Sequence, residues 1–93
     1  MELSDDILNR LRDYAANLMS VTDIAVLLDL DPDELREAIS DKYHPAYKFY
    51  RRGKAETIFA IRELEIELAK TASPAAISNI GHYLTDMQAD EQE

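Results

Sequence analysis

Residues 20–39 read SVTDIAVLLDLDPDELREAI, and this stretch decides the fold class of the chain. Its apolar residues recur at three- and four-residue intervals on both sides of a short polar turn, which is the period of a helix buried on one face. Ser20 and Asp31 stand where a side-chain oxygen can accept hydrogen bonds from the first amides of each helix. Asp29 stands where a turn of this kind needs a positive φ, which Asp tolerates better than most residues. The stretch therefore has the spacing of a helix-turn-helix, and a plain pair of packed helices has the same pattern.

The rest of the chain shows the same helical period. Ser4 can cap a helix whose apolar stripe runs over residues 3–19. A proline can open a long helix over residues 45–72, and Ser73 followed by a proline starts another that extends to residue 87. No stretch alternates apolar and polar residues as a half-buried strand does.

We therefore predict an all-α protein of one small domain. An N-terminal helix-turn-helix bundle is followed by an antiparallel hairpin made of one long and one short helix. The predicted boundaries are 1–44 for the helix-turn-helix region, 45–87 for the hairpin and 88–93 for an acidic, disordered tail.

The chain is acidic, with 10 Lys and Arg against 19 Asp and Glu and a formal net charge of −9. This balance argues against a general affinity for nucleic acid or anionic membranes, but not against a local cationic patch. There is no Cys, which excludes disulfides and Cys-based metal sites. The acidic start lacks the regions of a signal peptide, and the longest apolar run, residues 24–28, is too short to cross a bilayer. We expect a cytoplasmic protein without a membrane partner.

One segment reverses this charge. Residues 42–54 contain five Lys or Arg and no Asp or Glu, together with four of the seven aromatic residues. At 100° per residue, Tyr47 and the four cations within residues 48–54 share an arc of roughly 160°. Such a face can neutralise phosphates, but it can also be a solvated surface that offsets the acidic residues nearby. Gly53 costs about 1 kcal/mol inside a helix relative to Ala, so it marks a close helix crossing or a kink.

The third predicted helix, after Asp31, offers a poorer surface for DNA. Its polar residues carry a net negative charge and would face two rows of phosphates in a major groove. Only Arg36 and Ser40 on this helix suit contact with a base edge or a phosphate. The residues predicted to contact double-stranded DNA are Arg36, Ser40, Lys42, Tyr47, Lys48, Arg51, Arg52 and Lys54.

The long helix has more apolar surface than one neighbour can cover. Its apolar arc is roughly 220° wide at 100° per residue, against the ~100° stripe of an ordinary surface helix. Another copy of the chain can cover the remainder, and a compact monomer with this helix at its centre is the alternative. The residues predicted to form a homo-oligomer interface are Ile58, Phe59, Ile61, Leu64, Leu68, Ile77, Ile80 and Leu84.

No arrangement of residues indicates catalysis, a cofactor or a metal site. The two histidines, His44 and His82, belong to no metal-binding pair, and His44 suits a cap or turn because a proline follows it. Residues 29–33 begin like a calcium loop, but Glu34 and Ser40 stand where the loop requires Gly and Glu. We therefore predict a protein that is not an enzyme.

The order of the motifs resembles a known family. After the helix-turn-helix come HPAY at residues 44–47, YRRGKAE at 50–56 and ASPAA at 72–76. This order is similar to that of the small terminase subunits of tailed phages and of related helix-turn-helix proteins of prophages, over residues 20–87. The resemblance implies a ring-forming, non-enzymatic protein in the host-cell cytoplasm. Such a protein binds phage DNA and presents it to a large ATPase/nuclease subunit for packaging.

Two other functions fit the same residues. One is an acidic helical interaction module that binds a basic protein through its helix-turn-helix surface. The other is a small helix-turn-helix transcriptional regulator. DNA binding through several cations becomes steeply weaker as salt rises, so a salt-dependent affinity for DNA would distinguish a DNA-binding protein from the interaction module. A footprint with paired half-sites on DNA would identify a dimeric regulator.

Overall fold

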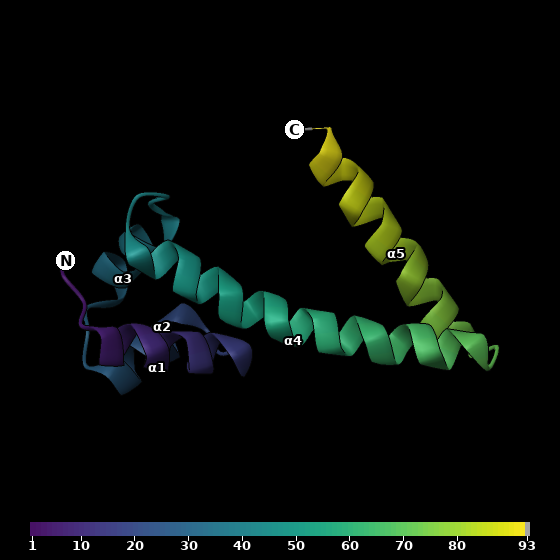
Figure 1. Cartoon of the computed structure of the whole chain (residues 1–93), viewed down its shortest axis with the longest axis horizontal. Helices are drawn as coiled ribbons and strands as arrows, with labels where there is room; N and C mark the ends of the chain where they lie inside the picture. The colour runs from purple at the N-terminus through teal and green to yellow at the C-terminus, as the bar shows by residue number, and fades with distance from the viewer. Residues whose placement is uncertain (93) are drawn as a thin grey trace. The chain divides into compact units, whose positions relative to one another are not determined.

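The computed structural model describes residues 1–92, and this part of the chain contains α-helices and turns without a strand, which confirms the all-α class (Figure 1). By their internal contacts the residues form two compact units, Met1–Ile58 and Phe59–Glu93, and the fourth helix belongs to both. The helices are α1 (Asp5–Ala16), α2 (Val21–Leu28), α3 (Pro32–Ser40), α4 (Pro45–Lys70) and α5 (Pro74–Glu91).

Four helices begin at the side-chain caps predicted from the sequence. In each case a side-chain oxygen accepts a hydrogen bond from an amide two or three residues further on, at 2.9–3.4 Å. A cap of this kind is worth about 1 kcal/mol. The four caps are Ser4, Ser20, Asp31 and Ser73.

The turn between α2 and α3 has the backbone conformation predicted for Asp29. This residue ends α2 with φ 57° and ψ 45°, in the left-handed region. The amide of Leu30 then donates to the carbonyl of Ala25 at 2.9 Å, a bond that closes the end of the helix. Ala25 is fully buried in the core of the first unit. Because the side chain of Ala25 is small, the turn, α2 and α3 can all pack closely against the core at this position.

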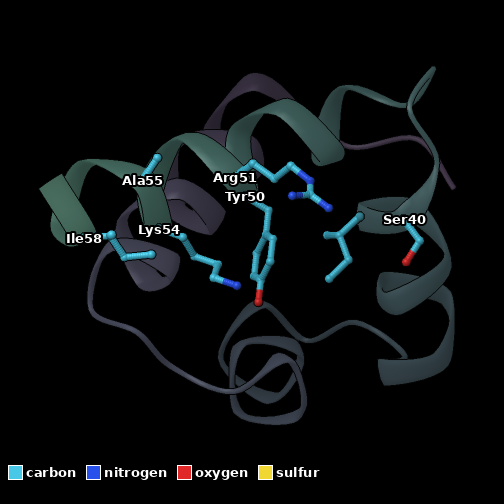
Figure 2. Close-up of a pocket in the computed structure, with 7 residues that line it drawn as sticks. Ser40, Tyr50, Arg51, Lys54, Ala55 and Ile58 are labelled. Atoms are coloured by element: carbon cyan, nitrogen blue, oxygen red, sulfur yellow. The ribbon is translucent and has the colours of Figure 1, made fainter. Parts of the chain in front are cut away.

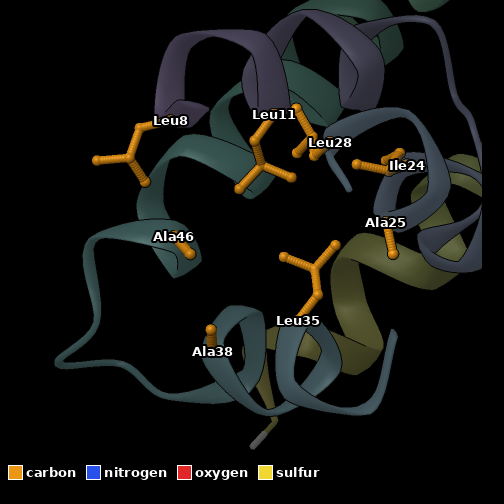
Figure 3. Close-up of a cluster of buried hydrophobic side chains, with 8 residues drawn as sticks. All are labelled: Leu8, Leu11, Ile24, Ala25, Leu28, Leu35, Ala38 and Ala46. Atoms are coloured by element: carbon orange, nitrogen blue, oxygen red, sulfur yellow. The ribbon is translucent and has the colours of Figure 1, made fainter. Parts of the chain in front are cut away.

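The first unit has one hydrophobic core, to which four helices contribute. Leu11, Ile24 and Leu35, from α1, α2 and α3, are its largest fully buried side chains. Figure 3 shows Leu11 and Leu35 pointing toward each other. Burying a Leu or Ile side chain is worth about 1.5–3 kcal/mol. The buried members of the core are Leu8, Leu11, Ile24, Ala25, Leu28, Leu35, Ala38 and Ala46.

α4 crosses α1 at Gly53, which is one of the two roles that the sequence predicts for this glycine. A methyl group on Gly53 would overlap the carbonyl oxygen of Arg12 and lie 3.0 Å from the amide nitrogen of Ala16. One turn further along α4, the hydroxyl of Thr57 donates a hydrogen bond to the carbonyl of Ala16. That carbonyl belongs to the last turn of α1, where no helical amide is available. The crossing therefore joins α4 to the backbone of α1.

His44 caps the start of α4, in agreement with its expected role as a cap or turn residue. Its Nδ1 accepts a hydrogen bond from the amide of Ala46 at 3.0 Å. Because Nδ1 is an acceptor here, Nε2 carries the proton and donates to the carbonyl of Met1, 2.6 Å away. The imidazole thus ties the first residue of the chain to the start of α4.

Two helix ends differ from the sequence prediction. α1 ends at Ala16, before the predicted apolar stripe does, because Leu18 adopts a left-handed conformation with φ 57°. α5 continues over residues 88–91, where a disordered tail was predicted, since most of these residues favour helix strongly. The prediction for Glu93 lies outside the described residues.

The second unit has almost no buried core. Among its described residues, 59–92, only Ala76 is buried. Side chains of α4 and α5 touch, with the guanidinium of Arg62 stacked 4.3 Å from the ring centroid of Tyr83. Six of the predicted interface residues are exposed, while Ile58 and Ile80 are half-buried. The exposed large apolar side chains of this unit are Phe59, Ile61, Leu64, Ile66, Leu68, Ile77, Leu84 and Met87.

Gly53→Ala should destabilise the protein by about 1–3 kcal/mol, although alanine is the better helix former, because the new methyl group overlaps a backbone carbonyl that cannot move independently. Gly81→Ala is the matched control. It also lies inside a helix, has open space around it, and should stabilise α5 by about 1 kcal/mol. Urea unfolding followed by circular dichroism measures both. Equal effects of the two substitutions would contradict the close crossing.

His44→Ala should lower the free energy of unfolding by about 1 kcal/mol, because α4 loses its cap at Ala46. His44→Asn restores a side-chain acceptor at the same position and should recover most of the loss. Tyr43→Ala serves as the control, since Tyr43 is 96% exposed. The same urea unfolding experiment measures all three, and an unchanged His44→Ala would show that the imidazole does not stabilise the start of α4.

Candidate nucleic-acid interface

The cations of α4 lie on the side of the helix that faces away from the core, as the 100° spacing predicts. Ala46 and Gly53 are buried and Phe49 is half-buried, and these three residues form the packed side. On the other side, the four cations are exposed and Tyr47 is half-buried. We refer to this set as the cationic face: Tyr47, Lys48, Arg51, Arg52 and Lys54.

Most of these charges have no acidic partner among residues 1–92. In the part of the chain that the structure describes, Lys42, Lys48, Arg51 and Lys54 form no ion pair. Arg52 is the exception, with its Nε 3.0 Å from a carboxylate oxygen of Glu56. The acidic residues of α3 therefore do not neutralise the cationic face by direct contact.

Two tyrosines hold cations of the face in place. The guanidinium carbon of Arg51 lies 4.6 Å from the ring centroid of Tyr47. The ammonium of Lys54 lies 5.4 Å from the ring centroid of Tyr50. Cation–π contacts at exposed positions are worth about 0.5–1 kcal/mol each. The aromatic residues of the segment thus reduce the freedom of the charged side chains without neutralising them.

Arg51 and Lys54 border an open groove of about 460 Å³ between α4 and the end of α3. In Figure 2, Tyr50, Arg51 and Lys54 project from α4 into this groove, and Ser40 lies on its far side. The apolar lining and the hydroxyls of Tyr50 and Ser40 give it a mixed character. The groove is lined by Ile39, Ser40, Tyr50, Arg51, Lys54, Ala55 and Ile58, and we call it the α3–α4 groove.

The other residues predicted to contact DNA, such as Arg36 and Lys42, do not line this groove. The guanidinium of Arg36 donates to the hydroxyl of Thr22 at 2.7 Å and to a carboxylate oxygen of Asp33 at 3.0 Å. Two of its donors thus link α3 to α2 and pair with a carboxylate of α3, and Arg36 does not line the groove. Lys42 is exposed on the turn between α3 and α4. Of the eight predicted contacts, the groove brings together Ser40, Arg51 and Lys54.

A cation that the sequence analysis missed lies on the other flank of α4. Arg12 of α1 lines a pocket of about 170 Å³ together with Lys48, Phe49 and Arg52, which we call the α1–α4 pocket. Arg12 belongs to a strongly acidic segment, far from the basic one in the sequence. In the sequence, only Gly53 indicates that Arg12 could lie here. A close crossing at Gly53 has to bring part of another helix beside its neighbour Arg52.

A second arginine of α1 is used inside the fold. The guanidinium of Arg10 donates to the hydroxyl of Tyr14 at 3.2 Å and to the carbonyl of Leu27 at 3.4 Å. The hydrogen bond that Arg10 donates to the Tyr14 hydroxyl raises the pKa of Arg10 above its ordinary value. Arg10 connects α1 to α2 and is not part of the cationic face.

Neither a metal nor a membrane is indicated by the described residues. Residues 1–92 contain no group of three or more His, Asp or Glu side chains placed to hold a metal ion. None of their helices combines the length and the apolar character that crossing a bilayer requires.

No family model, curated protein or solved structure matches the chain. The similarity to small terminase subunits therefore stays a resemblance that rests on the order of the sequence motifs. The function has to be inferred from the charge, burial and geometry described above.

Proposed function

We propose that this protein is a non-enzymatic, homo-oligomeric DNA-binding protein that takes the phosphate backbone of double-stranded DNA on the cationic face of α4. One observation carries this proposal. The charges of Lys48, Arg51 and Lys54 are exposed and have no acidic partner among residues 1–92, in a chain whose net charge is −9. Protein–DNA affinity comes largely from Lys and Arg that replace the counterions of phosphates.

The helix-turn-helix is proposed to position this face rather than to read bases itself. The left-handed Asp29 and the capped α3 fit such a motif. The exposed residues of α3, however, include Asp33, Glu34 and Glu37, which phosphates on both sides of a major groove would repel. Arg36 is already hydrogen-bonded within the protein. We therefore assign the principal DNA contact to α4.

Oligomerisation is proposed to occur through the second unit. Its described residues bury only Ala76, while Phe59 and Leu64 are 64% and 61% exposed. Leaving such a side chain in water forgoes roughly 1.5–3 kcal/mol that another chain can supply. Several DNA-binding faces in one assembly also act at a high effective concentration, which raises the avidity for a continuous duplex.

Supported by the terminase resemblance alone, we propose that this activity serves the packaging of phage DNA in the host-cell cytoplasm, with a large ATPase/nuclease subunit as a further partner. The acidic surface of α3 favours a second candidate, a helical module that binds a basic protein. In the second case, binding to duplex DNA would be absent at all salt concentrations. A small transcriptional regulator would instead protect paired half-sites in a footprint.

The double variant Arg51→Ala/Lys54→Ala should bind a short labelled duplex at least about tenfold more weakly than the parent. The plot of log K against log salt should become less steep by about two, because two phosphate contacts are lost. The control variant Arg36→Ala/Lys70→Ala removes the same charge from elsewhere on the chain and should bind like the parent to within about twofold. Fluorescence anisotropy at several salt concentrations measures both. Equal losses in the two variants would mean that net charge, and not the cationic face, controls binding.

Leu64→Glu should convert the assembly to smaller species, because a charge in the buried interface would be left unpaired. The monomer itself should fold normally, since Leu64 is 61% exposed. Gln88→Glu introduces the same charge at an exposed polar position of the second unit and should leave the assembly intact. Sedimentation velocity measures the species present. A parent protein that sediments as a monomer at micromolar concentrations would exclude the oligomer.

A further inference from the structure

The α1–α4 pocket collects three cations from two helices around one cavity. Arg12 comes from α1, and Lys48 and Arg52 come from successive turns of α4. Phe49, half-buried against the core, supplies the apolar wall. The pocket, about 170 Å³ in volume and open to solvent, has room for a polyatomic ion.

The close crossing at Gly53 puts Arg12 in this position. Because the carbonyl of Arg12 contacts the α-carbon side of Gly53, the two helices approach with almost no side chain between them. Arg52, the neighbour of Gly53 in the chain, therefore lies beside α1. A larger residue at position 53 would separate Arg12 from the other two cations.

Neighbouring carboxylates reduce the charge of the pocket without filling it. Arg52 contacts Glu56 through Nε at 3.0 Å, and Arg12 Nη2 lies 3.8 Å from Asp13. Ion pairs at such exposed positions are worth about 0–1 kcal/mol, so a stronger anion can compete with them. Each guanidinium has five N–H donors in a planar fork, and Lys48 makes no ion pair among residues 1–92. The pocket therefore keeps donors for an external acceptor.

We propose that the α1–α4 pocket binds a phosphate group of the DNA backbone, so that α1 takes part in DNA binding through Arg12. The inference rests on the proposed function and extends its interface to a second helix. A phosphate has several oxygens that can accept from donors on three sides, and arginine forks match its geometry. A carboxylate has only two oxygens for the three cations.

The pocket and the α3–α4 groove lie on opposite flanks of the cationic face. Arg52 lines the pocket and Lys54 lines the groove, and their positions are roughly 160° apart around α4. Phosphates bound on both flanks would place the outward ridge of α4, including the half-buried Tyr47, between two segments of backbone. The first half of α4, and not α3, is then the helix that faces a groove of the duplex.

Arg12→Gln tests the proposal, with Arg10→Gln as the matched control on the same helix. The first variant should bind a short duplex about threefold to tenfold more weakly and reduce the salt slope by about one. Arg10→Gln has the same charge change but lies outside the pocket, so it should bind like the parent. Arg12→Lys keeps the charge and should recover part of the affinity. Circular dichroism verifies that each variant is folded. Equal binding by Arg12→Gln and Arg10→Gln, whether both weakened or both unchanged, would overturn the proposal.

A second measurement uses inorganic phosphate as the probe and does not depend on DNA. In an NMR titration at constant ionic strength, phosphate should shift the Nε–H signals of Arg12 and Arg52 and the backbone signal of Phe49 in the parent, and much less in Arg12→Gln. Sodium chloride at the same ionic strength should not shift them. If the parent binds no DNA but shows the phosphate shifts, the proposed function fails while the anion site stands. If DNA binds and the shifts are absent, only the pocket is refuted.

Discussion

The close contact between Gly53 and the backbone of Arg12 is the constraint on which the first unit depends. Glycine inside a helix costs about 1 kcal/mol relative to alanine, and the chain recovers this cost through the approach that the missing side chain permits. The crossing lets Thr57 bond the carbonyl of Ala16 at the end of α1, and it brings Ala46 into the core. The same contact fixes the rotation of α4, because the face opposite Gly53 must then point to solvent. The exposure of the cations is thus a consequence of how α4 packs.

The features that sequence reasoning predicted correctly depend on residues close together in the chain. A cap such as Ser20 needs only an amide three residues away, and the left-handed conformation of Asp29 needs only a turn after a helix. The outward direction of the cations follows from the helical period once the packed side of α4 is identified. For this reason the helix starts and the core face of α4 could be inferred before any coordinates, whereas for Gly53 the sequence left a close crossing and a kink as alternatives.

The features that sequence reasoning missed are set by residues far apart in the chain. Nothing local to Arg36 shows that its guanidinium will bond Thr22, since that contact depends on how α2 and α3 meet. Arg12 lies among acidic residues, and only the crossing with α4 gives it cationic neighbours. The extent of α5 was underestimated for another reason. The acidic composition of residues 88–91 is typical of a disordered tail, but Gln, Ala and Glu all favour helix, and here the helix propensity prevails.

If the protein binds DNA as proposed, the acidic surface and the cationic face act together. A chain with net charge −9 is repelled by a polyanion at long range, so attraction is confined to orientations in which the cationic face is nearest to the duplex. A single face with few phosphate contacts then binds weakly at physiological salt, because each contact contributes only a limited counterion release. Assembly changes this balance, since several faces held on one duplex gain affinity without new contacts in any of them. Under the proposed function, DNA binding by a weak face on an acidic chain would therefore be conditional on assembly, and the exposed apolar surface of the second unit would control the function proposed for the first.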